Sequence, residues 1–411
     1  MSYPILYFYG PRVFDENAEK TVQHIKDAGF TRMQAEIGDV AQKKRIIALA
    51  ETYGLEVTVQ DARIEQAKDN AGQRRELLAQ VVADYKDCPN VVAYDFGDEP
   101  NAAAFETWGA TSALLKQLDP AREVYVNLYP NYANAQQLGN GSYEEHLREF
   151  SETVKPEILS YDHYHFGGRG WKFQSIEGES DRDRFIRENA FSTKLGNKFF
   201  ENLEQVRNES LRTGVPFMVI VLLAEHGNYR CLSEAEIRWE AFQCLAYGSN
   251  RISYFTYGNY LEDPNDNLWK NRNACVNYDN TRNRHWFDVR RVNEDLQVLG
   301  SYLQGKANTG VFHWGECKDK LVSFYEPGGD ISKIQSQAGL TLGFFAGGEI
   351  LLANKDYETV NHTELTLVND KHLEIYDKHS AEWYAILPKI NTIDVFPFVL
   401  APGDAELIRI R

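Results

Sequence analysis

The sequence contains few cysteines and none of the spacings that mark a metal ribbon. Five cysteines occur in 411 residues, at positions 88, 231, 244, 275 and 317. An odd and scattered set with no Cys-x-x-Cys pair excludes a zinc ribbon and a disulfide framework. Free thiols are then the default state, which favours a reducing compartment.

The sequence also lacks a long apolar segment. No run of about 18 apolar residues occurs, so no membrane-spanning helix and no membrane partner are expected. The first residues, MSYPILYFYGP, carry no basic segment and are too short for a signal peptide, so they predict a first strand. We therefore expect a cytoplasmic protein, or a secreted one if a leader has been removed.

Positive charge is scarce, because 44 Lys and Arg residues stand against 60 Asp and Glu residues, for a net charge of −16. A surface this acidic repels phosphate backbones, so nucleic acid is not expected as a partner. Aromatic residues are plentiful, with 7 Trp, 23 Tyr and 22 Phe, and their flat apolar faces suit sugar ligands. The sequence gives no indication of the oligomeric state.

Strand-like runs alternate regularly with helix-like segments through the first three quarters of the chain. Eight such units in about 300 residues are typical of a (β/α)₈ TIM barrel, an α/β fold. No GxGxxG turn follows the first strand, which argues against a doubly wound open sheet. Residues 1–306 are therefore predicted to form the barrel, with strands at 4–10, 31–37, 55–61, 91–101, 123–130, 158–166, 216–226 and 251–258.

The pattern changes after residue 306. Short alternating runs separated by Gly, Asn and Asp turns predict an all-β, sandwich-like C-terminal domain over residues 307–411. The strand-like runs are 311–316, 320–327, 340–355, 363–370, 381–388 and 405–411. This domain is expected to stabilise the last barrel helix, and an independent sugar-binding module is the alternative.

The ends of the predicted barrel strands carry polar residues, and barrel active sites lie at these ends. The fourth strand, VVAYDFGDEPN, ends on Asp98 and Glu99, and alternation places Asp95, Gly97 and Glu99 on one face. The seventh strand ends on Glu225, the only charge in its inward-facing set. Two carboxylates across a barrel mouth, about 5–5.5 Å apart, perform retaining glycoside hydrolysis.

This arrangement resembles the clan A glycoside hydrolases, which carry the acid/base on strand four and the nucleophile on strand seven. GDEPN at 97–101 is similar to the family's strand-four motif, in which Asn-Glu-Pro is usual. The resemblance implies that Glu99 is the acid/base and Glu225 the nucleophile. Asp98 departs from the motif, since an ionised Asp only accepts hydrogen bonds where the Asn amide donates to the sugar. The resemblance also implies that Tyr164, in Asp162-His163-Tyr164, hydrogen-bonds Glu225.

The substrate expected from this resemblance is a β-linked carbohydrate, cleaved without a cofactor or metal. Residues at strand ends and in the following loops are predicted to bind it: Asp98, Asn127, Tyr129, Asp162, Tyr164, Trp171, Tyr257 and Trp269. Trp239 and Trp286 are instead expected to be helix core residues.

Several alternatives stay open at this point. Glu225 could be a loop carboxylate paired with Arg230 or Arg238, with Glu234 or Glu262 as the second catalytic acid. Asp95 could be a buried structural acid.

Two other functions compete with the hydrolase. His163 and His165, with Asp162 and His226, could bind a metal in a metal-dependent barrel hydrolase. Such barrels carry His-x-His on strand one, however, where this chain has no histidine. The other competitor is a catalytically inactive barrel that binds carbohydrate.

Overall fold

The computed structural model describes residues 2–11, 17–167, 198–227, 229–260, 271–368 and 371–411. The chain divides into two units. The first comprises Pro4–Cys231 and Arg251–Phe287, and the second comprises Met1–Tyr3, Leu232–Asn250 and Asp288–Arg411. The predicted boundary between residues 306 and 307 remains a prediction.

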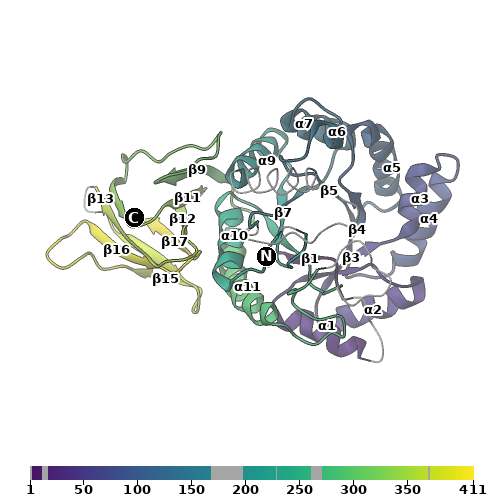
Figure 1. Cartoon of the computed structure of the whole chain (residues 1–411), viewed down its shortest axis with the longest axis horizontal. Coiled ribbons are helices and arrows are strands. Elements are labelled where there is room, and N and C mark those ends of the chain that lie inside the picture. Colours follow the sequence, from purple (N-terminus) through teal and green to yellow (C-terminus); the bar gives the residue numbers. More distant parts are fainter. Residues whose placement is uncertain (1, 12–16, 168–197, 228, 261–270, 369–370) are drawn as a thin grey trace, which may run out of the picture. The chain divides into compact units, whose positions relative to one another are not determined.

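The first unit contains a barrel of eight parallel strands, hydrogen bonded in the order β1-β8-β7-β6-β5-β4-β3-β2 (Figure 1). Between β1 and β2, the backbone N–H of Thr31 donates to the carbonyl of Ile5 at 2.9 Å, which nearly closes the ring. The strands are β1 Ile5–Phe8, β2 Arg32–Ala35, β3 Glu56–Gln60, β4 Val91–Asp98, β5 Glu123–Leu128, β6 Leu159–His163, β7 Phe217–Leu222 and β8 Arg251–Phe255.

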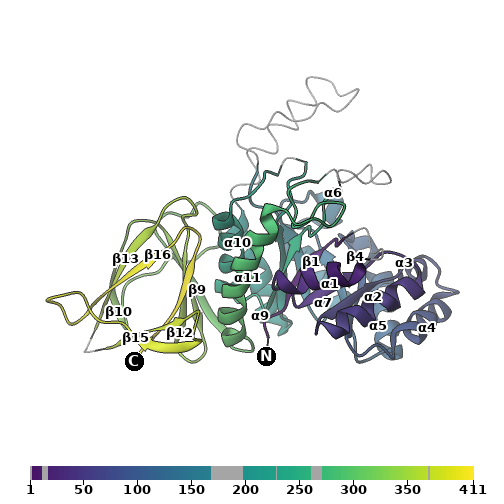
Figure 2. The same ribbon diagram turned by 90° about the horizontal axis from the view of Figure 1, so that it is seen from below.

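Apolar sequence explains why these strands lie at the centre. All six residues of β7, FMVIVL, are buried, as expected for a parallel strand covered on both faces. The helices that the structure describes in this unit run outside the strands, as Figures 1 and 2 show from two sides. They are α1 Ala18–Asp27, α2 Val40–Thr52, α3 Ala62–Asp69, α4 Arg74–Tyr85, α5 Phe105–Leu118, α6 Ala135–Leu138, α7 Tyr143–Val154 and α9 Phe199–Thr213, with a 3₁₀ turn at Ala102–Ala104. The predicted (β/α)₈ barrel is confirmed.

The second unit contains helix α10, Glu234–Ala246, most of α11, Arg284–Leu303, and two antiparallel sheets. Ser233 and Glu236 form a capping box at the start of α10. None of the helices that the structure describes is long and apolar enough to cross a membrane.

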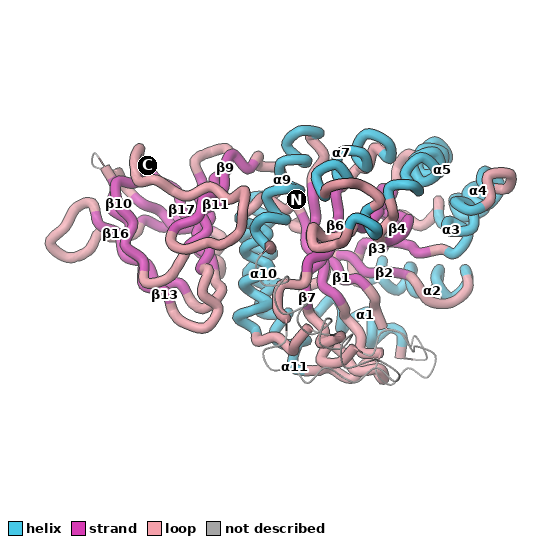
Figure 3. The backbone as a smooth tube through the Cα atoms, turned by 45° about the horizontal axis from the view of Figure 1, so that its top comes forward, coloured by secondary structure: helices cyan, strands magenta, loops and turns pink. Residues whose placement is uncertain are grey.

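The two sheets have the orders β10-β13-β16 and β15-β14-β17-β12-β11-β9, and their strands appear in magenta in Figure 3. Leu342 and Leu352 from one sheet and Leu365 and Phe398 from the other share one apolar core, which confirms the predicted all-β C-terminal part. The strands are β9 Asn308–Trp314, β10 Ile331–Ser336, β11 Leu340–Phe345, β12 Glu349–Asn354, β13 Asn361–Leu367, β14 Leu373–Asp377, β15 Glu382–Ala385, β16 Val395–Leu400 and β17 Ala405–Ile410.

One predicted strand is wrong. Residues 320–327 form an isolated bridge beside β9, in which the N–H of Tyr325 donates to the carbonyl of His313 at 2.8 Å. Leu321 and Phe324 are 55% and 50% exposed. β10, β14 and β16 were not among the predicted strands.

Candidate active site

The end of β4 departs from simple strand alternation. The register against β5 shifts between Asp95 and Gly97, which marks a bulge, and Gly97 has a φ of +140°. A Cβ atom at Gly97 would lie 2.7 Å from the Trp108 ring and 2.8 Å from the Lys68 Nζ. Glycine is therefore required here, and the expectation that residues 95, 97 and 99 simply alternate onto one face is wrong.

Asp95 lies below the bulge inside the barrel and is 5% exposed. It accepts hydrogen bonds from Gln34 Nε2 at 3.0 Å and from the Gly97 N–H at 3.2 Å. Burial, reinforced by the charge of Asp98, raises the pKa of Asp95 to about 7. Asp95 thus has the buried, hydrogen-bonded environment of a structural acid.

Glu99 directly follows β4 in a left-handed conformation, with a φ of 46°. Its N–H donates to the carbonyl of Asn127 at 2.9 Å. A non-glycine residue in this region is strained by about 1 kcal/mol or more, and such strain is frequent at active sites. Burial and then the charge of Asp98 raise the pKa of Glu99 to about 7. No side chain or backbone donor in the described part of the chain hydrogen-bonds the Glu99 carboxyl.

Asn127 connects the carboxyls around Glu99. Its Nδ2 donates to Asp98 Oδ1 at 2.9 Å and to Asp162 Oδ1 at 3.0 Å, and its Oδ1 accepts from Ser160 Oγ at 3.0 Å. Asn127 is 2% exposed and Ser160 is fully buried. Both amide hydrogens are therefore used within the protein, which leaves Asn127 without a hydrogen to donate to a ligand.

The neighbouring acids share this enclosed environment. Asp162, on β6, is 7% exposed, and burial followed by the charges of Glu99 and Asp98 raises its pKa well above the usual range. Asp98 is exposed to solvent at the end of β4, but desolvation by the surrounding protein raises its pKa. Asp98, Glu99 and Asp162 form what we call the mouth cluster.

The tyrosines predicted to bind substrate lie in different surroundings. Tyr129 is close enough to the mouth cluster that, after burial, the Glu99 charge is the next cause of its raised pKa. The Tyr164 ring packs against His226 at 5.4 Å, Tyr229 at 5.1 Å and Phe255 at 5.2 Å between ring centroids. Among the described side chains Tyr164 makes no hydrogen bond with Glu225, contrary to the expectation.

The remaining predicted substrate-binding residues are Tyr257, Trp171 and Trp269. Tyr257 is fully buried against Tyr7 and Phe30, at 4.9 and 5.4 Å between ring centroids, so its ring offers no free face to a ligand. Trp171 and Trp269, like Glu262, lie outside the described residues.

Glu225 lies in the loop after β7, because that strand ends at Leu222 rather than at the predicted 226. The ladder stops where the carbonyl of Phe255 accepts from both the Leu223 and the Ala224 N–H. Glu225 then pairs with Arg272 in an isolated antiparallel bridge, with N–H to carbonyl distances of 2.8 and 2.9 Å.

The Glu225 carboxylate, whose side chain is 12% exposed, is held by two donors from the loop after β8. Asn273 Nδ2 donates to Oε2 at 2.7 Å, and Arg272 Nε lies 3.3 Å from Oε1. Its ion pair is thus made with Arg272, which sequence reasoning missed, whereas Arg238 pairs with Glu234. No motif marks Arg272 or Asn273, since both come from an irregular segment far along the chain.

The histidines considered as metal ligands are buried and uncharged. His163 is bonded through Nδ1 to Asn202 Oδ1 at 2.9 Å, and His226 through Nδ1 to the Ala224 carbonyl at 2.8 Å. Burial lowers the pKa of both to about 4 and that of His165 to about 3. Within the described ranges, no three His, Cys, Asp or Glu side chains are grouped to hold a metal ion.

A pocket of about 380 Å³ opens beside the mouth cluster, at the ends of β2, β3 and β4. Its size lies within the range of small-molecule sites. Its polar lining includes Glu36, Lys43, Gln60, Asp61, Glu65 and Asp95.

Comparisons with known proteins concern the fold. No family model matches the sequence, and no curated protein sequence matches it. A glycoside hydrolase family 5 structure from Bacteroides vulgatus aligns with 99% of this chain and 89% of its own, at 13% identity and a TM-score of 0.59. A β-galactosidase from the haloarchaeon Halorubrum lacusprofundi aligns over 100% of both chains, at 10% identity and a TM-score of 0.52.

A third structure, a β-galactosidase from Marinomonas ef1, aligns with 73% of this chain at 8% identity and a TM-score of 0.50. The match spans 60% of the length of that enzyme. At these identities the likeness shows a shared fold: the chain has the barrel architecture of these glycoside hydrolases.

Proposed function

We propose that this protein is a retaining glycoside hydrolase that cleaves β-linked sugars with Glu99 as acid/base and Glu225 as nucleophile. The observation that carries the proposal is the contrast between the two carboxyls. Glu99 has a pKa raised to about 7 and no hydrogen-bond donor among the described residues, as suits a proton donor. Glu225 makes an ion pair with Arg272 and accepts a hydrogen bond from Asn273, as suits a carboxylate anion.

The reaction would proceed in two steps. Protonated Glu99 donates its proton to the glycosidic oxygen while a Glu225 oxygen attacks the anomeric carbon, so the leaving group departs as an alcohol and a glycosyl ester forms. Glu99, now a carboxylate, removes a proton from water, which attacks the anomeric carbon and releases Glu225. Asp162 is less suited to be the nucleophile, because burial and the charges of Glu99 and Asp98 raise its pKa and so disfavour the carboxylate form.

The test uses aryl β-glycosides, beginning with β-galactosides because two structures of similar fold are β-galactosidases. Glu99→Gln and Glu225→Gln should each lower kcat by about 10²- to 10⁴-fold. Glu149→Gln, a change of an exposed glutamate on α7, is the control and should leave kcat unchanged.

Two further measurements separate the roles. A 2-deoxy-2-fluoro glycoside should label Glu225, as mass spectrometry of the peptides would reveal. Azide should restore activity to Glu99→Ala on substrates with good leaving groups. A wild-type protein that binds sugars but hydrolyses none of a panel of aryl glycosides would refute the proposal in favour of a carbohydrate-binding barrel.

A further inference from the structure

The mouth cluster brings together three carboxyls from two strands. Asp98 and Glu99 are neighbours at the end of β4, whereas Asp162 comes from β6, two strands along the barrel. β5 lies between them and supplies Asn127, opposite Asp98 in the ladder. Nothing else in the described chain hydrogen-bonds both Asp98 and Asp162.

The Asn127 side chain has no remaining freedom of orientation. Its two Nδ2 hydrogens point to Asp98 and Asp162, and Ser160 Oγ donates to its Oδ1. Rotating the amide by 180° would point Oδ1 at two carboxyl oxygens and forfeit both charge-assisted hydrogen bonds. Because Ser160 and Asn127 are both buried, water does not compete for these groups.

We propose that Asn127, oriented by Ser160, is a positioning residue that ties Asp98 and Asp162 to Glu99, so that the three carboxyls exchange protons as one unit. The inference rests on the proposed function only in naming Glu99 the acid/base. It also gives Asp98 a role at the position where the similar motif has Asn: Asp98 supplies the negative charge that holds the proton on Glu99.

The direction of the coupling follows from the contacts. Two donated hydrogen bonds favour the ionised forms of Asp98 and Asp162, and Asn127 contributes to lowering the pKa of each against the larger effect of burial. An ionised Asp98 beside Glu99 disfavours a second negative charge, which keeps Glu99 protonated. Besides these acids, the titratable groups that sense the Glu99 charge are Tyr129 after β5 and Tyr229 after β7.

The experiment follows the titration of Glu99 directly, in the full-length protein without substrate, by NMR of ¹³C-labelled carboxyl groups. The Glu99 resonance is identified by its absence in Glu99→Gln. Asp98→Asn should lower the titration midpoint of Glu99 by about one pH unit, because a like charge is removed. Asn127→Ala should shift it in the same direction by less, because Asp98 then ionises less readily.

A conservative variant and a control complete the design. Ser160→Ala leaves Asn127 in place but removes the bond to its Oδ1, so it should give a smaller downward shift even if Asn127→Ala fails to fold. Ser151→Ala removes another buried serine, whose Oγ donates to the Leu147 carbonyl on α7 at 2.9 Å, and should give no shift.

The outcomes are distinguishable. A downward shift in Asp98→Asn and in Asn127→Ala or Ser160→Ala supports the inference. A shift in Asp98→Asn alone, or in none of them, overturns it. The titration needs no turnover, so a protein inactive on every glycoside would refute the proposed function and leave this result standing. If the protein is active, the alkaline limb of its kcat/KM profile should move with the NMR midpoint.

Discussion

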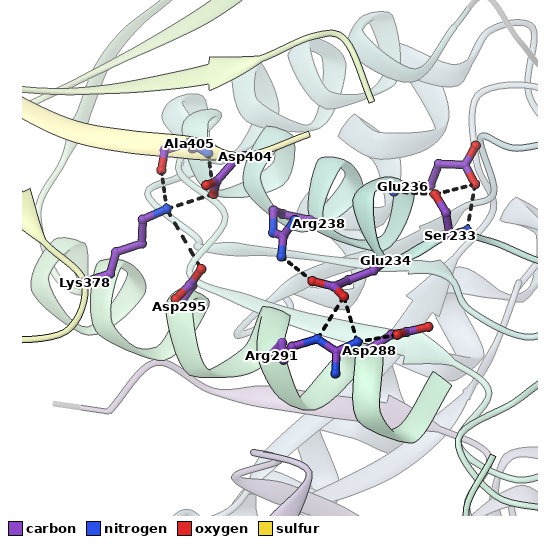
Figure 4. Close-up of polar contacts among 10 residues, drawn as sticks. All are labelled: Ser233, Glu234, Glu236, Arg238, Asp288, Arg291, Asp295, Lys378, Asp404 and Ala405. Carbon is purple, nitrogen blue, oxygen red and sulfur yellow. Dashed lines mark hydrogen bonds and ion pairs between the residues drawn. The ribbon is translucent and has the colours of Figure 1, made fainter. Parts of the chain in front are cut away.

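Each unit of the chain contains a cluster of three carboxyls, and the two clusters differ in whether a Lys or Arg pairs with them. In the mouth cluster, no Lys or Arg among the described residues pairs with Asp98, Glu99 or Asp162. In the second unit, Lys378 pairs with Asp295 and Asp404, as Figure 4 shows, and also with Glu406. The Lys378 Nζ lies 2.8 Å from Asp404 Oδ1, 3.5 Å from Glu406 Oε1 and 3.9 Å from Asp295 Oδ2.

The comparison shows that a raised pKa is not by itself the mark of a functional group. Burial raises the pKa of Glu406 to about 7, the value that Glu99 reaches, although Lys378 opposes the shift. Burial alone would lower the pKa of Lys378, but Glu406 and Asp404 outweigh it and raise that pKa. What sets the mouth cluster apart is that, within the described part of the chain, its carboxyls have no Lys or Arg as an ion-pair partner.

The largest effect on stability is expected from Lys378→Met. Truncating one member of a buried charged network leaves the others uncompensated, which typically costs about 3–5 kcal/mol. The free energy of unfolding from urea titrations measures the loss. Lys389→Met is the control in the same unit, because Lys389 pairs with Glu364 with its side chain 54% exposed. A change within about 1 kcal/mol is expected there.

The second prediction concerns the free energy of unfolding when an acid is changed to its amide. The change should destabilise the protein in the Lys378 cluster and stabilise it in the mouth cluster. Asp404→Asn should cost about 1–3 kcal/mol, because Asp404 accepts from Lys378 Nζ and from the Ala405 N–H. Glu99→Gln should instead stabilise the protein by about 1–2 kcal/mol at pH 8, because it removes a carboxylate that the fold disfavours.

The pH dependence of the Glu99→Gln effect follows from the raised pKa. The folded protein holds the Glu99 proton up to about pH 7, whereas the unfolded chain releases it near 4.5. Wild type should therefore lose more stability than the variant as the pH rises from 4.5 to 7, by the contribution of Glu99. Urea unfolding at pH 4, 6 and 8 measures this. Equal stability of wild type and Glu99→Gln at every pH would show that the fold does not raise the pKa of Glu99.

Much of the fold was predictable, because hydrophobic periodicity is a local signal. The eight barrel strands follow from apolar runs closed by Gly and polar turns. The predicted strands are wrong where contacts with residues distant in the sequence determine the backbone conformation. The β4 bulge depends on Trp108 and Lys68 lying over Gly97, and β7 ends early because Phe255 takes two donors. β16 was missed because Pro397 interrupts VFPFVL, which an edge strand tolerates.

The site was predictable to a lesser extent. Position at a strand end singled out Asp98, Glu99, Asn127 and Asp162, and the barrel topology explains why they meet. Sequence could not give Asn127 its role, because a hydrogen bond shared between two carboxyls depends on side-chain orientation. Arg272 also escaped notice, because no periodicity links the irregular segment after β8 to Glu225.

The smallest effect on stability is expected at Glu225, which makes one ion pair among the described residues, fewer than the Lys378 cluster and more than the mouth cluster. Arg272 is 44% exposed, and Asn273 remains bonded to Glu225 without it, so Arg272→Met should change the free energy of unfolding by less than about 1 kcal/mol. Arg290→Met is the control for stability, because Arg290 is 51% exposed and pairs with Glu294 on α11.

The two arginine variants are expected to differ in kcat. If Glu225 is the nucleophile, Arg272→Met should lower kcat by roughly tenfold, equivalent to about 1.4 kcal/mol of barrier, and Arg290→Met should not. If Arg272→Met instead costs as much stability as Lys378→Met while kcat is unchanged, Glu225 belongs with the Lys378 cluster as a structural acid. The nucleophile would then have to be one of the mouth-cluster carboxyls, which have no Lys or Arg partner among the described residues.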